Sequence, residues 1–418
     1  MLLQKKISIA QKYSQLVKSG VPDLIFWCGF VLLLVIHCIE NTSVIYSEAV
    51  WLNGMYLFRN LLYLILIGKI ALFSTFRKDE CICAILIGIV ALGSVLGSRD
   101  FALMEFFIIM LAAKGESPRR LVMVFAVIKA AALLLTLFFW RIGLLTAIYY
   151  QDDKVGFYNT YGFCHRNVLA ANVAVVCLAW FYLRYKRLKL WDVIVWTVIA
   201  LLTFRYAISR TGMIVILLII FGMYLVRKKR SRLLHFPSFR KLFLLGFVLM
   251  IFISILGTVF YSDQSAFWQL VDSVFTKRFQ YASYCLKEFG LSLFGQALPF
   301  VSSIEAQTSE TSKLILDNSF MRALLYYGII PGGMFLAIYF QALNLSLKKR
   351  NEKLAVSLFI LAVFGISERY MLDIYYQFPL WIAWNKYFFS GQEESTEQRK
   401  TFVEHLVALF YYCRGKIQ

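Results

Sequence analysis

Three motifs combine an arginine with small polar residues immediately before a long apolar run. They are GFCHRN with His165, Arg166 and Asn167, ISRTG with Ser209, Arg210 and Thr211, and LDNSFMR with Asp317, Asn318, Ser319 and Arg322. The planar guanidinium group donates two parallel hydrogen bonds to a phosphate or carboxylate, so such motifs are suited to binding an anion. A helix N-terminus adds unpaired backbone N–H groups and a positive dipole end. The motifs therefore predict anion sites at helix starts, with Asn167, Ser209 and Asp317 as N-caps.

A further arginine interrupts an amphipathic pattern between residues 262 and 317. Apolar residues recur there at steps of three and four and predict one amphipathic helix: Phe267, Val271, Val274, Ala282, Cys285 and Phe289. Arg278 stands where the spacing expects an apolar side chain, and a charge on a buried face needs a partner. We therefore expect Arg278 to clamp an anion above the membrane, or else to pair with a loop carboxylate or reach the lipid headgroups.

Group transfer to a hydroxyl at such a site would also need a general base. The candidates by residue type and position are Asp317, Glu288, Glu305 and His165. We prefer Asp317, with His165 assisting through a hydrogen bond. The competing interpretation is local, since His165, Asn167 and Asp317 could each simply cap a helix.

Metal and nucleotide chemistry find no support in the sequence. The histidines, His37, His165, His235 and His405, are scattered over different parts of the chain, so we expect no metal site. There is no P-loop and no nucleotide-binding GxGxxG, which argues against an ATP-driven pump. Cys164 and Cys285 both fall in predicted outer loops and could form a disulfide if they meet.

The composition is that of a membrane protein. Of 418 residues, 60% are hydrophobic and 16% charged, and the mean hydropathy is +0.68. Unbroken apolar runs such as Leu242–Phe260 favour helices over a barrel of alternating strands. We predict an all-α polytopic membrane protein with a single transmembrane domain over residues 1–390 and about twelve spans: 24–39, 53–75, 81–97, 101–113, 121–140, 168–183, 191–204, 211–226, 242–261, 319–345, 354–367 and 376–390.

Basic clusters give the predicted orientation. They fall in alternate connections, at 77–78, 114–120, 184–189, 227–232 and 348–350. Since such clusters stay on the cytoplasmic side, both termini should be cytoplasmic. The net charge of +20 then reflects topology and contact with membrane lipids, and we expect no nucleic-acid partner. The large loop 262–317 should lie outside, and the tail 391–418 should carry an amphipathic helix on the inner surface.

Four segments in order resemble the O-antigen and capsular polysaccharide polymerases. They are GFCHRNVLAANVA, SRTGMIVILLIIFG, KRFQYASYCLKEFGLSLFGQALPF and DNSFMRALLYYGIIPGG, and the resemblance covers roughly residues 156–340. It implies a metal-independent glycosyltransferase that joins undecaprenyl-pyrophosphate-linked repeat units on the outer face of the bacterial plasma membrane, without a cofactor. A chain-length regulator or other polysaccharide-synthesis proteins would be candidate partners.

The resemblance also implies roles for particular residues. Arg278 and Arg210 correspond by motif position to family arginines thought to hold the pyrophosphate. The related O-antigen ligases typically have a histidine before the asparagine that follows the large loop. Here Asp317 precedes Asn318, which favours a polymerase. Substrate contacts are expected from Arg166, Asn167, Ser209, Asn318 and Arg322.

Other functions stay open at this point. A lipid-linked oligosaccharide flippase or another transporter would also need outward arginines, and an O-antigen-type ligase shares the donor. A peptidoglycan glycosyltransferase of the cell-division type would use a similar lipid, but its motifs are not visible. Outward arginines at span entrances suit surface chemistry better than alternating access, because transporters usually carry their charges deeper.

Overall fold

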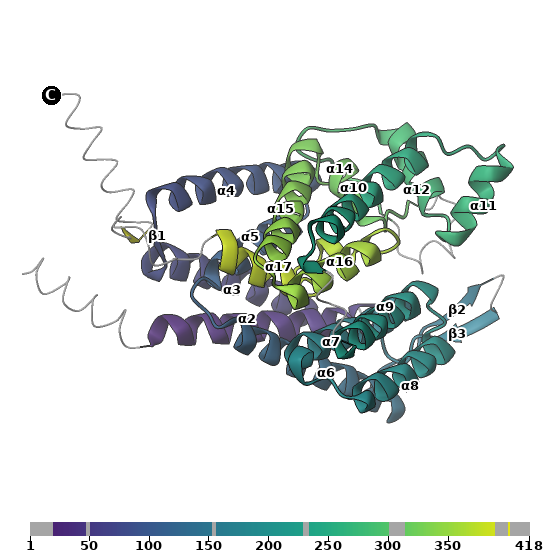
Figure 1. The fold of residues 1–418 in the computed structure, drawn as a ribbon, viewed down its shortest axis with the longest axis horizontal. Coiled ribbons are helices and arrows are strands. Elements are labelled where there is room, and N and C mark those ends of the chain that lie inside the picture. The colour runs from purple at the N-terminus through teal and green to yellow at the C-terminus, as the bar shows by residue number, and fades with distance from the viewer. Residues whose placement is uncertain are drawn as a thin grey trace, which may run out of the picture.

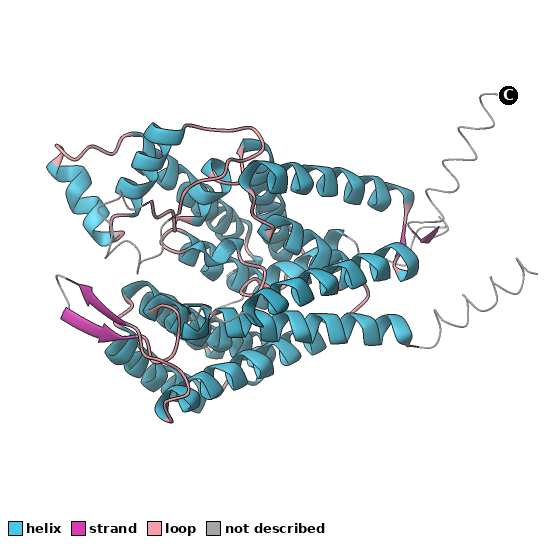
Figure 2. Cartoon of the chain, turned by 180° about the vertical axis from the view of Figure 1, so that it is seen from behind, coloured by secondary structure: helices cyan, strands magenta, loops and turns pink. Residues whose placement is uncertain are grey.

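The chain folds into a helical bundle with only short strands. The computed structural model describes residues 20–46, 51–152, 156–228, 234–300, 314–388 and 400–401. Nine of the described helices are long and apolar enough to cross a membrane, so the chain is a helical membrane protein, as predicted. They are α2 (Val21–Glu40), α3 (Trp51–Phe73), α4 (Lys78–Ser98), α6 (Pro118–Arg141), α7 (Arg166–Arg184, continued by the 3-10 turn η2, Tyr185–Arg187), α8 (Leu190–Ala207), α9 (Arg210–Arg227), α10 (Pro237–Val259) and α15 (Ile329–Lys348). Figures 1 and 2 show them side by side in one bundle.

Shorter elements complete the described fold. The helices are α5 (Ala102–Ala112), α11 (Ala266–Val274), α12 (Arg278–Phe289), α14 (Ser319–Leu325), α16 (Glu352–Gly365) and α17 (Phe378–Ala383), with the 3-10 turns η1 (Ser43–Tyr46) and η4 (Arg369–Leu372) and the π turn η5 (Trp384–Phe388). The antiparallel pairs are β1 (Thr75–Phe76) with β4 (Lys400–Thr401), and β2 (Tyr149–Asp152) with β3 (Gly156–Asn159). Thr75 pairs with Thr401, and Tyr149 with Asn159.

The outside of the bundle is apolar and its centre is close-packed. Leu64 of α3 and Leu96 of α4 are 65% and 75% exposed, as side chains that face lipid would be. Helix α7, in contrast, is largely enclosed, and its small residues Ala170 and Ala174 are almost completely buried. Small residues let neighbouring helices approach closely, so α7 serves as the centre against which α6 and α9 pack.

The two ends of the bundle differ. One end carries β1 and β4, in which Phe76 pairs with Lys400, whereas α11, α12 and the β2–β3 hairpin lie at the opposite end (Figure 1). The predicted amphipathic helix of the tail 391–418 lies outside the described residues, of which only Lys400 and Thr401 belong to the tail. We call the end with α11 and α12 the loop end.

The predicted single helix over residues 267–289 is wrong. The structure has two helices, α11 and α12, separated by a turn in which Thr276 and Lys277 adopt φ angles of 53° and 63°. Asp272 accepts hydrogen bonds from the backbone N–H groups of Phe279 (2.8 Å) and Gln280 (3.0 Å), which completes the start of α12. Arg278, at which the apolar pattern is interrupted, is therefore the first residue of α12 and not a charged residue in the middle of a helix.

The predicted span 319–345 is likewise divided. It consists of α14 and α15, and the backbone between them binds the end of the large loop: Ile329 N donates to Ser292 O (2.9 Å) and Gln296 N donates to Tyr326 O (3.1 Å). Unwound backbone is tolerated in a membrane protein where other protein groups satisfy it. The break at Tyr326–Gly328 therefore anchors residues 292–296 against the bundle.

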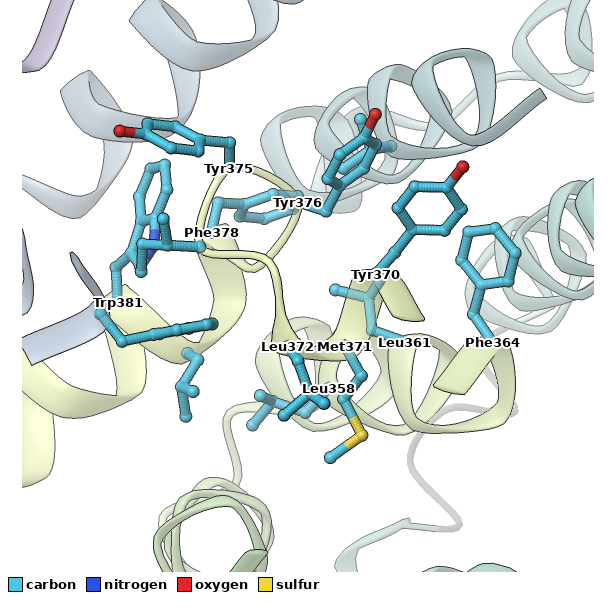
Figure 3. Close-up of a cluster of buried hydrophobic side chains, with 14 of the residues drawn as sticks. Leu358, Leu361, Phe364, Tyr370, Met371, Leu372, Tyr375, Tyr376, Phe378 and Trp381 are labelled. Atoms are coloured by element: carbon cyan, nitrogen blue, oxygen red, sulfur yellow. The ribbon is translucent and has the colours of Figure 1, made fainter. Parts of the chain in front are cut away.

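The stretch from residue 366 to 377, which we call the 366–377 segment, is irregular but buried. It begins after α16 and ends at α17. Figure 3 shows Tyr370 beside Phe364, and Met371 and Leu372 close to Leu358. The rings of Tyr370 and Tyr376 lie 4.6 Å apart between centroids. This aromatic packing fixes a segment whose regular structure is limited to the short turn η4, and its Glu368 contacts residues of the loop end.

Candidate functional site

The polar residues at the loop end converge on one buried carboxylate, Glu368, which is 4% exposed. Its Oε1 accepts from Asn167 Nδ2 at 2.8 Å and from Thr211 Oγ1 at 3.2 Å. Arg278 Nη2 lies 3.4 Å from the same oxygen, and Arg278 Nη1 lies 2.7 Å from Asp317 Oδ2. These five residues come from α7, α9, α12, the approach to α14 and the 366–377 segment. We call them the Glu368 cluster.

Close helix packing brings Asn167 and Thr211 to the same oxygen. Near the start of α9, a Cβ atom on Gly212 would lie 2.5 Å from the Cβ of Ala170 in α7, closer than real Cβ contacts allow. Glycine therefore permits the first turns of α7 and α9 to touch. Asn167 and Thr211 then lie close enough together for both side chains to reach Glu368 of the 366–377 segment.

Arg278 is held by three polar interactions, and the aromatic ring of the next residue is tightly packed. Besides its two carboxylates, its Nε donates to Ser367 O at 2.9 Å, and the side chain is only 10% exposed. The next residue, Phe279, packs on Gly257 of α10, where a Cβ atom would lie 2.6 Å from the ring. All three nitrogens of the guanidinium group therefore have a partner, as expected for a buried arginine that positions two carboxylates.

Burial shifts the pKa values of two groups at this site in opposite directions. Burial raises the pKa of Glu368 to about 7, with Asp317 adding to the rise while Arg278 and the Thr211 hydroxyl oppose it. Arg278 approaches Asp317 more closely than Glu368, so Glu368 is the less compensated acid. Burial also lowers the pKa of His165 to about 4, despite Asp317, so this imidazole is neutral near pH 7.

Three arginines lie at or beside the Glu368 cluster. Arg166, Arg278 and Arg369 all act on His165 electrostatically, against the carboxylate of Asp317. Burial lowers the pKa of Arg369, but Asp317 and Asp373 outweigh burial and the net shift is upward. These guanidinium groups can donate hydrogen bonds to the oxygens of a bound anion.

A cavity of about 160 Å³ lies beside the cluster. It is bounded by α2, α3, α5, α14 and the 366–377 segment, and its lining residues are mostly charged: His37, Glu40, Arg59, Asp100, Ala102, Glu105, Arg322, Tyr327, Arg369, Leu372, Asp373 and Tyr375. Arg369 follows Glu368 directly in the chain. The cavity and the Glu368 cluster are therefore neighbours joined by one peptide bond.

The structure unites some of the predicted site residues and separates others. Arg278, Asp317 and Asn167 meet in the Glu368 cluster, and His165 and Arg166 adjoin it at the start of α7. Arg322 donates to Leu316 O at 3.2 Å and lines the cavity. Arg210 instead is exposed at the first position of α9, and within the described residues it forms no ion pair with these acids.

The caps differ from the predicted ones at two of three helices. Ser209 caps α9 through Gly212 N at 3.3 Å, as predicted. His165 rather than Asn167 caps α7, and Asn318 rather than Asp317 caps α14. Both errors are shifts by one or two residues, and they have one consequence: the side chains of Asn167 and Asp317 are free to bind Glu368 and Arg278.

Other sequence-based expectations have mixed outcomes. Cys164 and Cys285 are both free thiols, so the suggested disulfide is not formed. Of the other candidate bases, Glu288 is exposed and Glu305 lies outside the described residues. Within the part of the chain that the structure describes, no three His, Cys, Asp or Glu side chains gather as metal ligands would.

Sequence reasoning missed Glu368 altogether, together with Asp373 and most of the cavity. The signal available was the pattern of Glu368, Arg369 and Asp373 between two apolar segments, since ionisable residues at such a position are costly unless they serve a site. Comparison with known proteins adds no assignment, because no protein family, curated protein or solved structure matches the chain.

The arrangement has a definite chemical capacity. A buried acid that titrates near neutrality can accept a proton from a hydroxyl group. Adjacent arginines can stabilise negative charge that develops on a leaving group in a site with little water. Both groups are held by rigid elements. The Glu368 cluster can therefore support transfer from a phosphate-linked donor to a hydroxyl acceptor.

Proposed function

We propose that the chain is a membrane glycosyltransferase that joins undecaprenyl-pyrophosphate-linked oligosaccharide repeat units into a polysaccharide. The observation that carries the proposal is the Glu368 cluster, in which one buried acid with a pKa of about 7 shares Arg278 with Asp317. The order of the four motifs that resemble polysaccharide polymerases supports the same reaction class.

The proposal includes a topology. Counting α14 with α15 as one crossing and α17 with η5 as another, the chain crosses the bacterial plasma membrane about twelve times with both termini cytoplasmic. Basic connections such as 184–189 then lie inside, and the loop end lies outside with the large loop 262–317. Lipid-linked repeat units are presented on that outer face.

The proposed reaction uses Glu368, and not Asp317, as the general base. The acceptor hydroxyl oxygen bonds to the anomeric carbon of the donor, and its proton passes to Glu368. The bond from that carbon to the pyrophosphate oxygen breaks, and undecaprenyl pyrophosphate leaves. Asp317 is less suited to the base role because its carboxylate is held 2.7 Å from Arg278.

Proton transfer and leaving-group stabilisation are coupled in this mechanism. When Glu368 takes up a proton, it loses its negative charge and its attraction for Arg278 Nη2 falls. That donor can then turn to the pyrophosphate, whose charge increases in the same step. Arg166 and Arg369 supply further positive charge, while neutral His165 can donate or accept a hydrogen bond at the start of α7.

The test is the size distribution of lipid-linked glycan in a strain that lacks the gene, complemented with the native chain or with Arg278→Ala or Glu368→Gln. Arg99→Lys, an exposed change at the end of α4, serves as a control. We expect single repeat units on the outer face, with longer chains restored by the native and control proteins only. Units held on the inner face would refute the proposal and indicate a flippase, and polymer without ligation to its acceptor would indicate a ligase.

A further inference from the structure

Apart from Arg369, the residues of the charged cavity beside the Glu368 cluster have no part in the chemistry described above. Its walls come from elements far apart in sequence: Glu40 ends α2, Arg59 lies in α3, Asp100 precedes α5, and Asp373 belongs to the 366–377 segment. Residues so distant are brought to one space only by the tertiary fold. A cavity of this kind at the reactive end of a protein is a natural candidate for binding part of the substrate.

The cavity presents both acceptors and donors. Glu40, Asp100, Glu105 and Asp373 supply carboxylates, whereas Arg59, Arg322 and Arg369 supply guanidinium groups. Several are already oriented by partners: Arg59 Nη1 lies 2.6 Å from Glu40 Oε1, and His37 Nε2 lies 3.7 Å from Asp373 Oδ2. Such pairing fixes the side chains, so that a ligand meets a preorganised polar wall.

One donor is left without an acceptor. Arg59 Nε is buried and has no hydrogen-bond acceptor within the described residues. A buried donor of this kind is costly, and an acceptor oxygen on a ligand would relieve the cost. The side chains of Arg59 and Asp373 also remain 28% and 27% exposed, so the polar wall is open to a molecule that enters the cavity.

Size and charge together select the class of ligand. An apolar cavity of about 150 Å³ in another protein holds one benzene molecule, so about 160 Å³ admits a single six-membered ring. The three guanidinium groups of the lining are matched by four carboxylates, so the cavity has no net positive charge that would select a phosphate, and the charged lining excludes an apolar chain. A ring with several neutral hydroxyl groups satisfies acceptors and donors alike. Tyr375, whose ring is stacked 4.4 Å from the His37 ring between centroids, also lines the cavity.

We propose that this cavity binds one neutral sugar ring of the glycan and recognises its hydroxyl groups through Asp373, Asp100, Glu105 and Arg59. This inference rests on the proposed function, because it takes the substrate to be a glycan. Since Arg369 of the cavity adjoins Glu368, the bound sugar lies next to the reacting groups. The cavity thereby contributes to the choice of repeat unit, whereas the Glu368 cluster binds the pyrophosphate.

The experiment measures binding and not polymer synthesis. The purified full-length protein in detergent is titrated with methyl glucoside, methyl galactoside, N-acetylglucosamine and, separately, inorganic pyrophosphate, and the thermal unfolding midpoint is followed. We expect at least one sugar to raise the midpoint by about 2 °C at saturation. Asp373→Asn should weaken this sugar effect about tenfold in apparent affinity and leave the pyrophosphate effect unchanged.

Two matched variants separate the cavity from the Glu368 cluster. Arg278→Lys should weaken stabilisation by pyrophosphate and preserve stabilisation by sugar. Asp79→Asn, which removes a carboxylate that is 64% exposed in the first turn of α4, should preserve both. If Asp373→Asn does not fold, Asp100→Asn and Glu105→Gln test the other carboxylates that line the cavity.

The possible results are distinct. Failure of every sugar to stabilise the native protein, or equal stabilisation of native and cavity variants, overturns the inference. Sugar binding that depends on Asp373 in a protein found not to polymerise glycan supports the sugar site while refuting the proposed function. Polymerisation by the native chain, together with the failure of every sugar to stabilise it, refutes the sugar site alone.

Discussion

Replacing Glu368 by Gln should abolish activity and yet stabilise the protein above neutral pH. The pKa of Glu368 rises from an ordinary 4.5 to about 7 on folding. A carboxyl group whose pKa is higher in the folded state binds its proton more tightly there. It therefore costs no stability below about pH 4.5 and progressively more as the pH rises to 7. Glutamine resembles the protonated form at every pH.

The expected magnitude follows from the shift. One pKa unit corresponds to about 1.4 kcal/mol, so the charged carboxylate costs about 3 kcal/mol of folding free energy above pH 7. The side chain is only 5% exposed, so this value needs no reduction for solvent screening. Glutamine also keeps an oxygen that can accept from Asn167 and Thr211. The stability gained by Glu368→Gln should thus grow from nearly zero at pH 4.5 to about 3 kcal/mol at pH 8.

The assay is the unfolding free energy of native and variant protein at several pH values between 5 and 8, beside polymer synthesis over the same range. Activity of the native chain should rise through pH 7 as Glu368 loses its proton, and that of the variant should be absent throughout. Asp79→Asn provides an exposed control with little effect at any pH. A variant that is less stable than the native protein at pH 8, or a stability difference that does not change with pH, would show that folding does not raise the pKa of Glu368 and would refute this reasoning.

Further variants test the geometry of the site. Arg278→Lys keeps the charge but loses the paired donors of the guanidinium group, so we expect at least a tenfold loss of polymer synthesis. Full activity would show that the site needs only a positive charge at this position. Arg210→Ala should retain most activity in the same assay because Arg210 is exposed and apart from the Glu368 cluster, and a loss equal to that of Arg278→Ala would place it in the site after all. Gly212→Val should destabilise the protein by about 2 kcal/mol, measured by thermal unfolding, because its Cβ would meet Ala170 at 2.5 Å; an unchanged midpoint would rule out tight α7–α9 contact.

The parts of the site that could be read from the sequence are those that depend on neighbouring residues. Long apolar runs predict helices that cross a membrane, because a span must satisfy its backbone internally and bury about 20 apolar residues. Polar residues before such runs predict helix starts, and Ser209 does cap α9. The break in the apolar pattern at Arg278 also had a local cause, although it marks the start of α12 and not a charged helix face.

Tertiary structure alone decided which residues meet. Asn167 and Glu368 are 201 positions apart, and their contact depends on the close approach of α7 and α9 and on the aromatic packing of the 366–377 segment. The choice between Arg210 and Arg278 was likewise tertiary, since both begin helices but only Arg278 faces the acids. Periodicity and capping are set within a few residues, whereas burial, which raises the pKa of Glu368, arises from the packing of the whole bundle.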